Sequence, residues 1–434
     1  MKKKLAIIGS GIAGLSSAYF LQNEFDVTVF EKNDYLGGHA NTRIVRDSQG
    51  KAIPIDTGFI VYNELTYPNL TKLFDQLRVP IAESDMSFSF YNPSSQFEYG
   101  GGGLKALFAD PRNLINKRFY KMIKDIIKFY KTFQKGKADP KISLRQYLDK
   151  NNYSKEFIDF HFIPLISSIW STPDQNSLDQ PLSSIVSFFQ NHKLFNFLNR
   201  PQWKTVQGGS QNYIQCLIKA SHFQVQLSSQ IKSIYRNPQI QIQTQKETLS
   251  FDYLIFACSP KMFLPVLMDK TAEEIKLLST FQFQPNLTQL HQNPSLMPPH
   301  RAAWSSWNFH TNEHQLCTLT YWMNRLQPLA TPDQFFVSLN QQKLNPIYQT
   351  IYEHPIFSMT TLQAQKDISR LQGYQKTFYA GSYLGYGFHE DGIQSGLAVA
   401  EAISGAQRPW NFSLRKSRIA LPEHWGSEKK ERVS

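Results

Sequence analysis

The chain has 434 residues, of which 41% are hydrophobic and 14% aromatic, and it carries a formal net charge of +12. That is enough material for a large core and too much for one simple layer, so two intertwined domains are expected. The three cysteines, at positions 216, 258 and 317, form no CxxC pair. Neither a disulfide framework nor a zinc site is therefore predicted, and a reducing, cytoplasmic compartment fits best.

The positive charge has three interpretations: solubility, attraction to an anionic membrane face or acidic substrate, and nucleic-acid binding. The sequence shows no zinc-finger spacing and no aromatic RNA-binding motif, which disfavours nucleic acid. No apolar run approaches the length of a membrane span. Solubility and peripheral contact with an anionic membrane both stay open.

The N-terminal segment reads as strand, turn, helix and strand. The apolar run Leu5–Ile8 predicts a buried strand, and residues 12–22 predict a helix that follows a glycine turn. Residues 27–30 predict a second strand that ends at Glu31. The lysines at positions 2–4 before an apolar run imitate a signal peptide, but three glycines at dinucleotide-fold spacing favour the strand and helix.

The glycine turn has the pattern of a dinucleotide-binding motif. In Gly9-x-Gly11-x-x-Gly14, the first glycine permits a tight turn, the second lets the backbone approach a pyrophosphate, and the third lets the helix pack on the strand. Phosphates are then bound at the helix N-terminus. Glu31 follows at the spacing expected for a carboxylate that binds the adenosine ribose, and it disfavours NADP.

The middle of the chain is less regular. Residues 113–133 have apolar side chains at helical spacing, with Lys121, Lys124, Lys128 and Lys131 among the lysines between them. This basic amphipathic helix either packs on a core with a solvated lysine face or contacts a membrane or another anion. Further strands are expected at 224–227, 240–244, 251–257 and 376–380, and a last helix is expected at 393–403. The tail from residue 407 is basic, and we expect it to be loosely held.

Several blocks resemble the flavin amine oxidase superfamily, a group of glutathione-reductase-like FAD proteins. They are the glycine pair at 37–38 after the ribose acid, the Asp-Thr-Gly at 56–58, the Val-Gln-Gly-Gly-Ser at 206–210, the segments 229–231 and 252–257, and the closing blocks 379–382 and 392–396. The sequences of other blocks, such as Gly-Gly-His-Ala-Asn-Thr from residue 37, resemble those of bacterial NAD/FAD-binding flavoproteins. Those proteins are often associated with cyclopropane-fatty-acid synthase.

The chain departs from the family pattern at three places. The closing motif has Ser382 where an acid is usual, and His39 stands where an arginine is common. The segment 385–387 lacks the cysteine through which some monoamine oxidases attach their flavin. The resemblance therefore implies FAD that is bound non-covalently, and no metal.

The expected fold is α/β, with a discontinuous Rossmann-type FAD-binding domain and a mixed α+β substrate domain. The first comprises residues 1–68, 202–260 and 370–406, the second comprises 69–201 and 261–369, and residues 407–434 form the basic tail. The resemblance assigns cofactor contacts to Gly9, Ser10, Gly11, Ile12, Ala13, Gly14, Glu31, Lys32, Gly37, Gly38, His39, Thr57, Gly58, Ile231, Gly381, Ser382, Gly392, Ile393 and Ser395.

The predicted activity is an FAD-dependent oxidoreductase of the oxidase, desaturase or dehydrogenase type. The resemblance implies hydride removal from an apolar, fatty-acyl or lipid substrate. Oxidation of a C–H bond often needs a polar group that takes the second hydrogen, and His389 with Glu390 is our candidate pair. Glu390 and Asp391 could instead cap the last helix. An amine oxidase, a redox-neutral flavin isomerase and a non-catalytic FAD- or lipid-binding subunit are the alternatives. The wider polar and aromatic candidates are His39, Tyr62, Asn63, Trp304, Trp307, Tyr321, Trp322, Asn324 and Tyr386.

Overall fold

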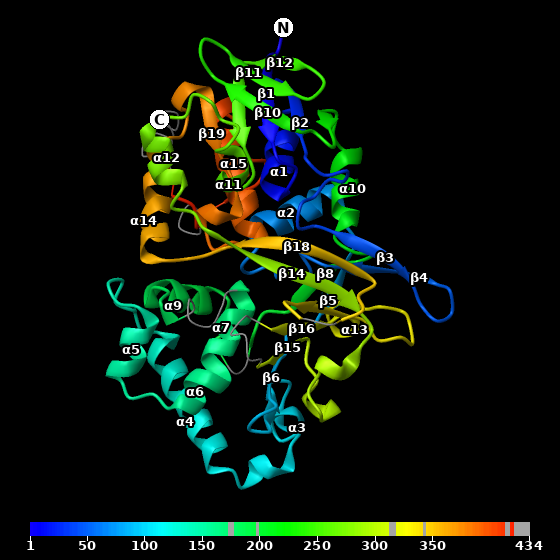
Figure 1. Ribbon diagram of the computed structural model, residues 1–434, viewed down its shortest axis with the longest axis vertical. Helices are drawn as coiled ribbons and strands as arrows, with labels where there is room; N and C mark the ends of the chain where they lie inside the picture. The colour runs from blue at the N-terminus through cyan, green and yellow to red at the C-terminus, as the bar shows by residue number, and fades with distance from the viewer. Residues whose placement is uncertain (172–177, 197–198, 312–317, 342–343, 413–416, 421–434) are drawn as a thin grey trace.

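The computed structural model describes residues 1–171, 178–196, 199–311, 318–341, 344–412 and 417–420. The molecule is elongated, with two halves along its long axis (Figure 1). The upper half in this view is built on a parallel sheet, and we call it the parallel-sheet half. The lower half, built on a mixed sheet with helices α3 to α9 beside it, is called the aromatic half.

Five parallel strands form the sheet of the upper half, in the order β19-β13-β1-β2-β9. Along β1 the side chains alternate between two cores, because Leu5 and Ile7 face one cluster while Ala6 and Ile8 face the other. A strand covered on both faces is typical of a doubly wound sheet. The bounds are β1 (Lys3–Ile8), β2 (Phe25–Phe30), β9 (Gln224–Gln226), β13 (Tyr253–Phe256) and β19 (Thr377–Tyr379).

Helices α1 (Ile12–Leu21) and α15 (His389–Ser404) pack against each other beside this sheet. Their contact is close because two glycines of α15 face α1. A Cβ atom on Gly396 would lie 2.3 Å from the carbonyl oxygen of Ala13, and one on Gly392 would lie 2.7 Å from Ile12 Cγ2. The glycine spacing of the closing motif is thus explained by helix packing.

The aromatic half contains a seven-stranded sheet in the order β18-β14-β17-β16-β15-β6-β7. Its neighbouring strands are antiparallel except for β6 and β15, which are parallel. The bounds are β6 (Phe88–Asn92), β7 (Phe97–Gly100), β14 (Phe283–His291), β15 (Trp307–His310), β16 (Leu319–Trp322), β17 (Phe336–Leu339) and β18 (Tyr348–Pro355).

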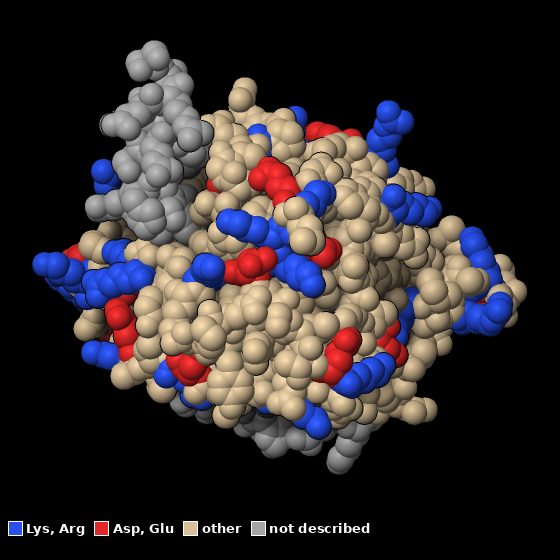
Figure 2. All heavy atoms as spheres, turned by 90° about the horizontal axis from the view of Figure 1, so that it is seen from above, with Lys and Arg blue, Asp and Glu red and all other residues tan. Residues whose placement is uncertain are grey.

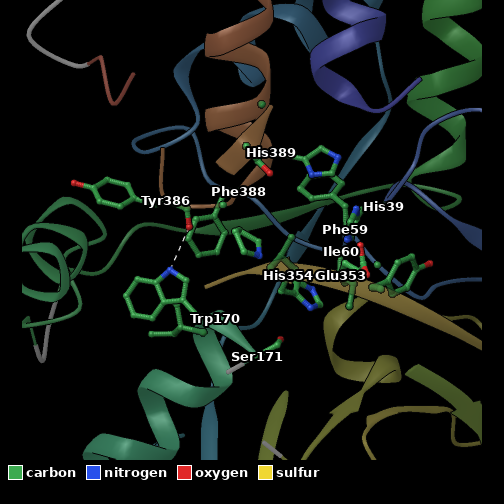
Figure 3. A pocket seen from close by; sticks show the side chains of 18 of the residues that line it. His39, Phe59, Ile60, Trp170, Ser171, Glu353, His354, Tyr386, Phe388 and His389 are labelled. Carbon is green, nitrogen blue, oxygen red and sulfur yellow. Dashed lines mark hydrogen bonds between the residues drawn. The ribbon is translucent and has the colours of Figure 1, made fainter. Parts of the chain in front are cut away.

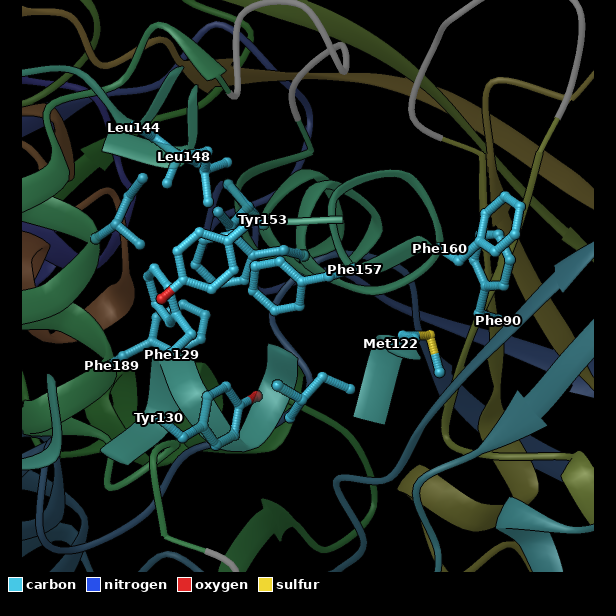
Figure 4. Close-up of a cluster of buried hydrophobic side chains, with 14 of the residues drawn as sticks. Phe90, Met122, Phe129, Tyr130, Leu144, Leu148, Tyr153, Phe157, Phe160 and Phe189 are labelled. Atoms are coloured by element: carbon cyan, nitrogen blue, oxygen red, sulfur yellow. The ribbon is translucent and has the colours of Figure 1, made fainter. Parts of the chain in front are cut away.

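The helices of the aromatic half enclose a core rich in phenylalanine and tyrosine (Figure 4). Phe129 of α4 is central, since its ring centroid lies 4.3 Å from that of Phe162 and 4.9 Å from that of Phe133. The helices are α3 (Leu104–Leu107), α4 (Lys117–Gln134), α5 (Leu144–Lys150), α6 (Lys155–Phe157), α7 (Ile163–Trp170) and α9 (Leu182–Asn191), with a π-helical turn at Ile158–Phe162.

Smaller elements connect these parts. Short sheets are formed by β3 (Thr42–Arg46) with β4 (Ala52–Asp56), by β5 (Ile81–Ser84) with β8 (Trp203–Val206), and by β10 (Ile231–Tyr235), β11 (Ile240–Thr244) and β12 (Thr248–Phe251). The other α-helices are α2 (Pro68–Leu77), α10 (Gln211–Lys219), α11 (Pro260–Phe263), α12 (Ala272–Leu278), α13 (Met323–Leu326) and α14 (Met359–Asp367). Within the described ranges, no helix is both long and apolar enough to cross a bilayer.

Three expectations need correction. The last helix begins at His389 rather than at residue 393, and the basic helix begins at Lys117 rather than at residue 113. The described part of the tail is packed rather than loosely held. The guanidinium of Arg408 lies 2.8 Å from the carboxylate of Glu401, and Ile419 is only 7% exposed. The remainder of the tail, with residues 413–416 and 421–434, lies outside the described residues.

Positive and negative side chains are interspersed over the upper end of the molecule (Figure 2). This face shows no single continuous basic patch, although the whole chain has a net charge of +12. Recognition of a nucleic-acid backbone would need clustered Lys and Arg side chains. The face formed by the parallel-sheet half therefore gives no support to that interpretation.

Candidate cofactor site and adjoining cavity

One cavity of about 1790 Å³ runs from the parallel-sheet half into the aromatic half. At its upper end it is lined by Gly9, Gly11, Glu31 and Gly381, which follow the carboxyl ends of β1, β2 and β19 or open the helix between them. Ligands of doubly wound folds bind outside this edge of the sheet. The volume exceeds the roughly 300–1,000 Å³ that is usual for a pocket holding one ligand.

The glycine turn is held by close backbone contacts. The N–H of Gly9 donates to the carbonyl of Phe30 at 2.8 Å, and Gly9 has φ +109°, a conformation that favours glycine. A Cβ on Gly14 would lie 2.0 Å from the carbonyl oxygen of Gly9, so no larger residue fits. Gly11 is different, because a Cβ there would meet nothing within 4 Å. The structure thus leaves open space at the glycine that a pyrophosphate would approach.

Two features at this end suit the two parts of a dinucleotide. Gly11 is the N-cap residue of helix α1, and no side chain caps this helix. The first N–H groups of α1 and its dipole are therefore available to an anion. The Glu31 carboxylate accepts hydrogen bonds from Ser10 N at 3.0 Å, from Ser10 Oγ at 2.6 Å and from Asn33 N at 2.9 Å. These bonds fix the carboxylate beside the cavity, where a ribose would meet it. The residues present therefore fit the phosphates and adenosine of FAD.

Sixteen of the sequence-predicted site residues line the cavity. They are Gly9, Ser10, Gly11, Ile12, Ala13, Glu31, Lys32, Gly37, Gly38, His39, Gly58, Ile231, Gly381, Ser382, His389 and Gly392. The others lie behind them. Ser395 Oγ accepts from Gly381 N at 2.8 Å, and Thr57 Oγ1 lies 2.9 Å from the hydroxyl of Tyr352. Gly14 and Ile393 are packing residues, so these four support the lining rather than form it.

Three histidines line the middle of the cavity: His39, His354 and His389 (Figure 3). Burial lowers the pKa of His39 to about 4, and burial followed by the neighbouring His39 lowers the pKa of His354 and of His389 to about 3. All three rings are therefore neutral near pH 7. Among the described residues, no group of three His, Cys, Asp or Glu side chains is arranged to hold a metal ion.

The side-chain amide of Asn286 determines which ring nitrogen of His354 carries the proton. Asn286 Nδ2 lies 2.9 Å from His354 Nδ1 and 3.0 Å from the carbonyl of Ser171, while Asn286 Oδ1 accepts from Asn340 at 2.7 Å. The amide orientation is thus determined, and the amide nitrogen can only donate. His354 Nδ1 must accept, which places the ring proton on Nε2. Sequence reasoning missed His354, because no motif surrounds it.

The predicted pair His389 and Glu390 is separated by the structure. His389 faces the cavity, stacks on Phe59 with ring centroids 3.7 Å apart, and lies 3.1 Å from the hydroxyl of Tyr213. Its lowered pKa makes it a weak base and suits an uncharged hydrogen-bonding role. Glu390 is fully buried and does not line the cavity.

Glu390 instead joins two helices. Its carboxylate accepts from Asn69 Nδ2 at 2.7 Å, from the backbone N–H groups of Asn69 and Leu70 at 3.2 and 3.1 Å, and from Gln394 at 2.9 Å. These backbone groups belong to the first turn of α2, which has no side-chain cap of its own. The expected cap of α15 is supplied by Asp391, which accepts from Phe388 N at 2.8 Å. The placement of Glu390 thus does not support the predicted catalytic role.

The wall below the histidines is aromatic. Trp170 Nε1 donates to the carbonyl of Tyr386 at 3.2 Å, and this bond ties α7 to the segment before α15 (Figure 3). The rings of Phe188 and Phe388 stack with centroids 5.1 Å apart. Of the wider sequence candidates, His39, Trp307, Tyr321 and Tyr386 line the cavity, whereas Tyr62, Asn63, Trp304, Trp322 and Asn324 do not.

Comparison with known proteins supports this description. Residues 7–77 match the model of an NAD(P)-binding Rossmann-like domain. Over 62 residues the chain is 44% identical to a protoporphyrinogen oxidase of Dictyostelium discoideum, a match covering 12% of this chain and 11% of that protein. The match to this curated relative thus spans about a tenth of its length and is confined to a short stretch.

Solved structures match over nearly the whole chain. A CLA-producing fatty acid isomerase from P. acnes has a TM-score of 0.66 at 15% identity, covering 93% of this chain and 98% of that one. Cyclohexylamine oxidase from Brevibacterium oxydans IH-35A has a TM-score of 0.64 at 14% identity, covering 93% and 99%. This chain therefore shares the overall fold of these two structures. The expected α/β architecture, with a Rossmann-like part and a further mixed sheet, is confirmed.

Proposed function

We propose that the chain is an FAD-dependent oxidoreductase that acts on an apolar, lipid-like substrate. The observation that carries the proposal is the single cavity, which joins a dinucleotide-type site to an aromatic interior without an intervening wall. A cofactor in the upper part and a second molecule in the lower part would meet at the three histidines. The discontinuous domain division expected from the sequence is part of the proposal.

Different residues would bind the cofactor, orient the substrate and exclude water. The glycine turn, the N-terminus of α1 and Glu31 would hold the phosphates and ribose of FAD, which when bound supplies the capacity to accept a hydride. Neutral His354 and His389 would orient a substrate by hydrogen bonds. The aromatic wall would exclude water, which strengthens those hydrogen bonds. FAD would be held non-covalently.

The charges that line the cavity favour an apolar or anionic substrate over an amine. Among the described lining residues the carboxylates are Glu31, at the upper end, and Glu353, which precedes His354 and is paired with Lys261. The lower part presents Lys131 and Arg200 and no carboxylate. An ammonium group would there meet like charge without compensation. A redox-neutral isomerase is the second candidate, because the structure of a fatty acid isomerase matches over nearly the whole chain.

A substrate screen on the purified flavoprotein tests the proposal. Anaerobic addition of fatty acids, phospholipids and amines should bleach the flavin absorbance for the lipid class and leave it unchanged for amines. Product analysis by mass spectrometry separates oxidation, which lowers the substrate mass by two hydrogens, from isomerisation, which leaves it unchanged. Bleaching by amines alone would contradict the lipid assignment. Release of no flavin on denaturation would contradict non-covalent binding, and a preparation without flavin would contradict the cofactor.

We include peripheral contact with an anionic membrane in the proposal. Exposed apolar side chains gather near α3 and the start of α4, where Leu104 is 76%, Leu114 is 58% and Ile115 is 87% exposed. The predicted lysine face is less available, since Lys128 donates to the carbonyl of Asn151 at 2.8 Å and Lys121 lies 3.5 Å from Glu156.

The change Ile115→Ser should weaken binding to phosphatidylglycerol vesicles in co-sedimentation by about tenfold or more, because burial of one such side chain contributes roughly 1.5–3 kcal/mol. Its thermal stability should stay the same. The matched control is Ile44→Ser, at a position of β3 that is 66% exposed. Equal binding by both variants and the unchanged protein would argue against this contact surface.

A further inference from the structure

Exposed lining residues far from the glycine turn indicate that the cavity has a second opening. It is marked by side chains that line the cavity and also reach solvent, namely Leu104 of α3, Ile127 and Lys131 of α4, and Arg200. Leu104 is 76% and Ile127 is 37% exposed. The upper end has its own exposed lining residues, Lys32 and Met262. A second molecule can therefore reach the cavity without passing through the dinucleotide site.

Lys131 and Arg200 both line the cavity and both lie near Tyr130. Lys131 follows Tyr130 on α4, and Arg200 lies near enough to Tyr130 and His161 to influence the titration of both rings. Arg200 Nε donates to the carbonyl of Asn196 at 2.7 Å, and Asn196 also accepts from Gln134, one turn beyond Lys131. The two cations are thus held at the same rim by one loop and one helix.

No carboxylate of the described residues forms an ion pair with either cation. The lining carboxylates have other partners, since Glu31 bonds to Ser10 and Glu353 pairs with Lys261. Arg200 is held by backbone carbonyls, which orient the guanidinium and leave its charge uncompensated. Two cations without an anionic partner, of which Arg200 is oriented by backbone carbonyls, are suited to bind an anionic group.

Polar and apolar groups are segregated along the passage. At the mouth, the hydroxyl of Tyr99 lies 2.8 Å from His161 Nδ1, and the hydroxyl of Tyr130 lies 3.3 Å from His161 Nε2. The other lining residues of the lower part are largely apolar, and they include Ile126, Leu165, Ile169, Trp170 and Phe188. A molecule that fits this order has a charged head and an aliphatic tail.

We propose that Lys131 and Arg200 form a binding site for the anionic head of an amphiphile whose tail extends inward to His354 and His389. This deepens the proposed function, on which it rests, because it fixes the direction in which the substrate enters. Carbon atoms at a distance from the head would lie at the histidines, so the reaction would take place along the tail rather than next to the head.

The test measures binding of three probes with the same twelve-carbon tail to the FAD-loaded protein by titration calorimetry. The probes are laurate, dodecanol and dodecylammonium, each below its micelle concentration. Laurate should bind about tenfold more tightly than dodecanol, since two charge-assisted contacts are gained at a partly exposed site. Dodecylammonium should bind less tightly than dodecanol.

The double variant Lys131→Gln, Arg200→Gln should bring laurate to the affinity of dodecanol and leave dodecanol within twofold of its original affinity. The matched control is Lys124→Gln, an exposed lysine of the same helix that does not line the cavity, and it should change neither. Equal binding of laurate and dodecanol to the unchanged protein would overturn the proposal. An equal loss of both probes in the double variant would do so too, because it would show damage to the passage rather than loss of head recognition.

A vesicle experiment distinguishes a free anion from a lipid headgroup in a bilayer. Preference for phosphatidylglycerol over phosphatidylcholine vesicles that is lost in the double variant supports the same site acting on bilayer lipid. Laurate binding without vesicle preference supports a free anion, and absence of both overturns the site. Flavin content is measured in every sample, so failure of head recognition with FAD still bound leaves the proposed function standing.

Discussion

The two halves of the molecule encode their parts of the cavity in different ways. In the parallel-sheet half, the site is made of backbone: a glycine turn, a helix N-terminus and the ends of parallel strands. In the aromatic half, the cavity is made of side chains from α4, α7, α9 and β18, which lie far apart in the sequence. A backbone site requires a fixed local pattern, whereas a wall of side chains requires only that something apolar fills each position.

The largest effect on folding and flavin content is expected at two glycines of the parallel-sheet half, Gly11 and Gly14. Gly14→Ala should abolish folded, flavin-containing protein, because its Cβ would lie 2.0 Å from the carbonyl oxygen of Gly9. Gly11→Ala should fold with an unchanged melting temperature, since nothing lies within 4 Å of its Cβ, and should still lose FAD. Flavin content and thermal unfolding measure both. Folded Gly14→Ala protein that contains flavin would contradict the backbone account of the upper half.

The second prediction concerns acid and the aromatic half. Burial lowers the pKa of His161 and His192 to about 3 and of His291 to about 4, while unfolded histidine titrates near 6.5. The unfolded chain then binds protons that the folded chain does not. The stability contributed by these neutral rings is complete above pH 6.5 and is lost as the pH falls toward 3. The loss should reach about 4 kcal/mol per pH unit near pH 5.

Denaturant unfolding at several pH values measures this slope. His192→Phe should reduce it by about 1.4 kcal/mol per pH unit, because one of the three protons no longer contributes. His192 is well suited to the test, as its ring stacks on Phe188 with centroids 3.9 Å apart and a phenyl ring can take that place. An unchanged slope in the variant would show that His192 is already charged in the folded protein.

The third prediction concerns Glu390, the buried residue of α15 that accepts hydrogen bonds from the start of α2. Glu390→Ala should destabilise the protein by about 3 kcal/mol, since it leaves the buried N–H groups at the start of α2 without an acceptor. Turnover per bound flavin should stay within twofold. Glu390→Gln keeps one acceptor oxygen and should cost about half as much. A loss of turnover with stability and flavin intact would restore the catalytic role that the sequence suggested.

The sequence allowed prediction wherever a site depends on consecutive residues. Gly9 to Gly14 and Glu31 were assigned to the cofactor from spacing, and the structure places Gly9, Gly11 and Glu31 at the cavity. Thr57 and Ser395 were also assigned to the cofactor, and spacing does not reveal that their hydroxyls contact Tyr352 and Gly381. The motif identifies a region of the fold more surely than it identifies the atoms that face the ligand.

Prediction failed where function depends on a partner distant in sequence. No sequence motif around His354 predicts that Asn286 will fix its proton. The lysines of α4 looked like one solvated face, but Lys128 is bonded to Asn151 at the end of α5. Glu390 looked catalytic by its place near the closing motif, and only the packing of α15 on α2 shows its other use. These contacts arise from tertiary packing, which single-sequence patterns do not contain.

The strand order of the upper sheet also constrains how the protein is made. The strands leave the ribosome in the order β1, β2, β9, β13 and β19, and the edge strand β19 ends at Tyr379. After β2 has been synthesised, some 350 further residues must therefore be added before β19 completes the sheet. Contacts that distant in sequence slow folding, and exposed parallel strands invite aggregation meanwhile. Supplying riboflavin, or slowing translation, during expression should raise the yield of folded protein more than it does for proteins with locally closed sheets.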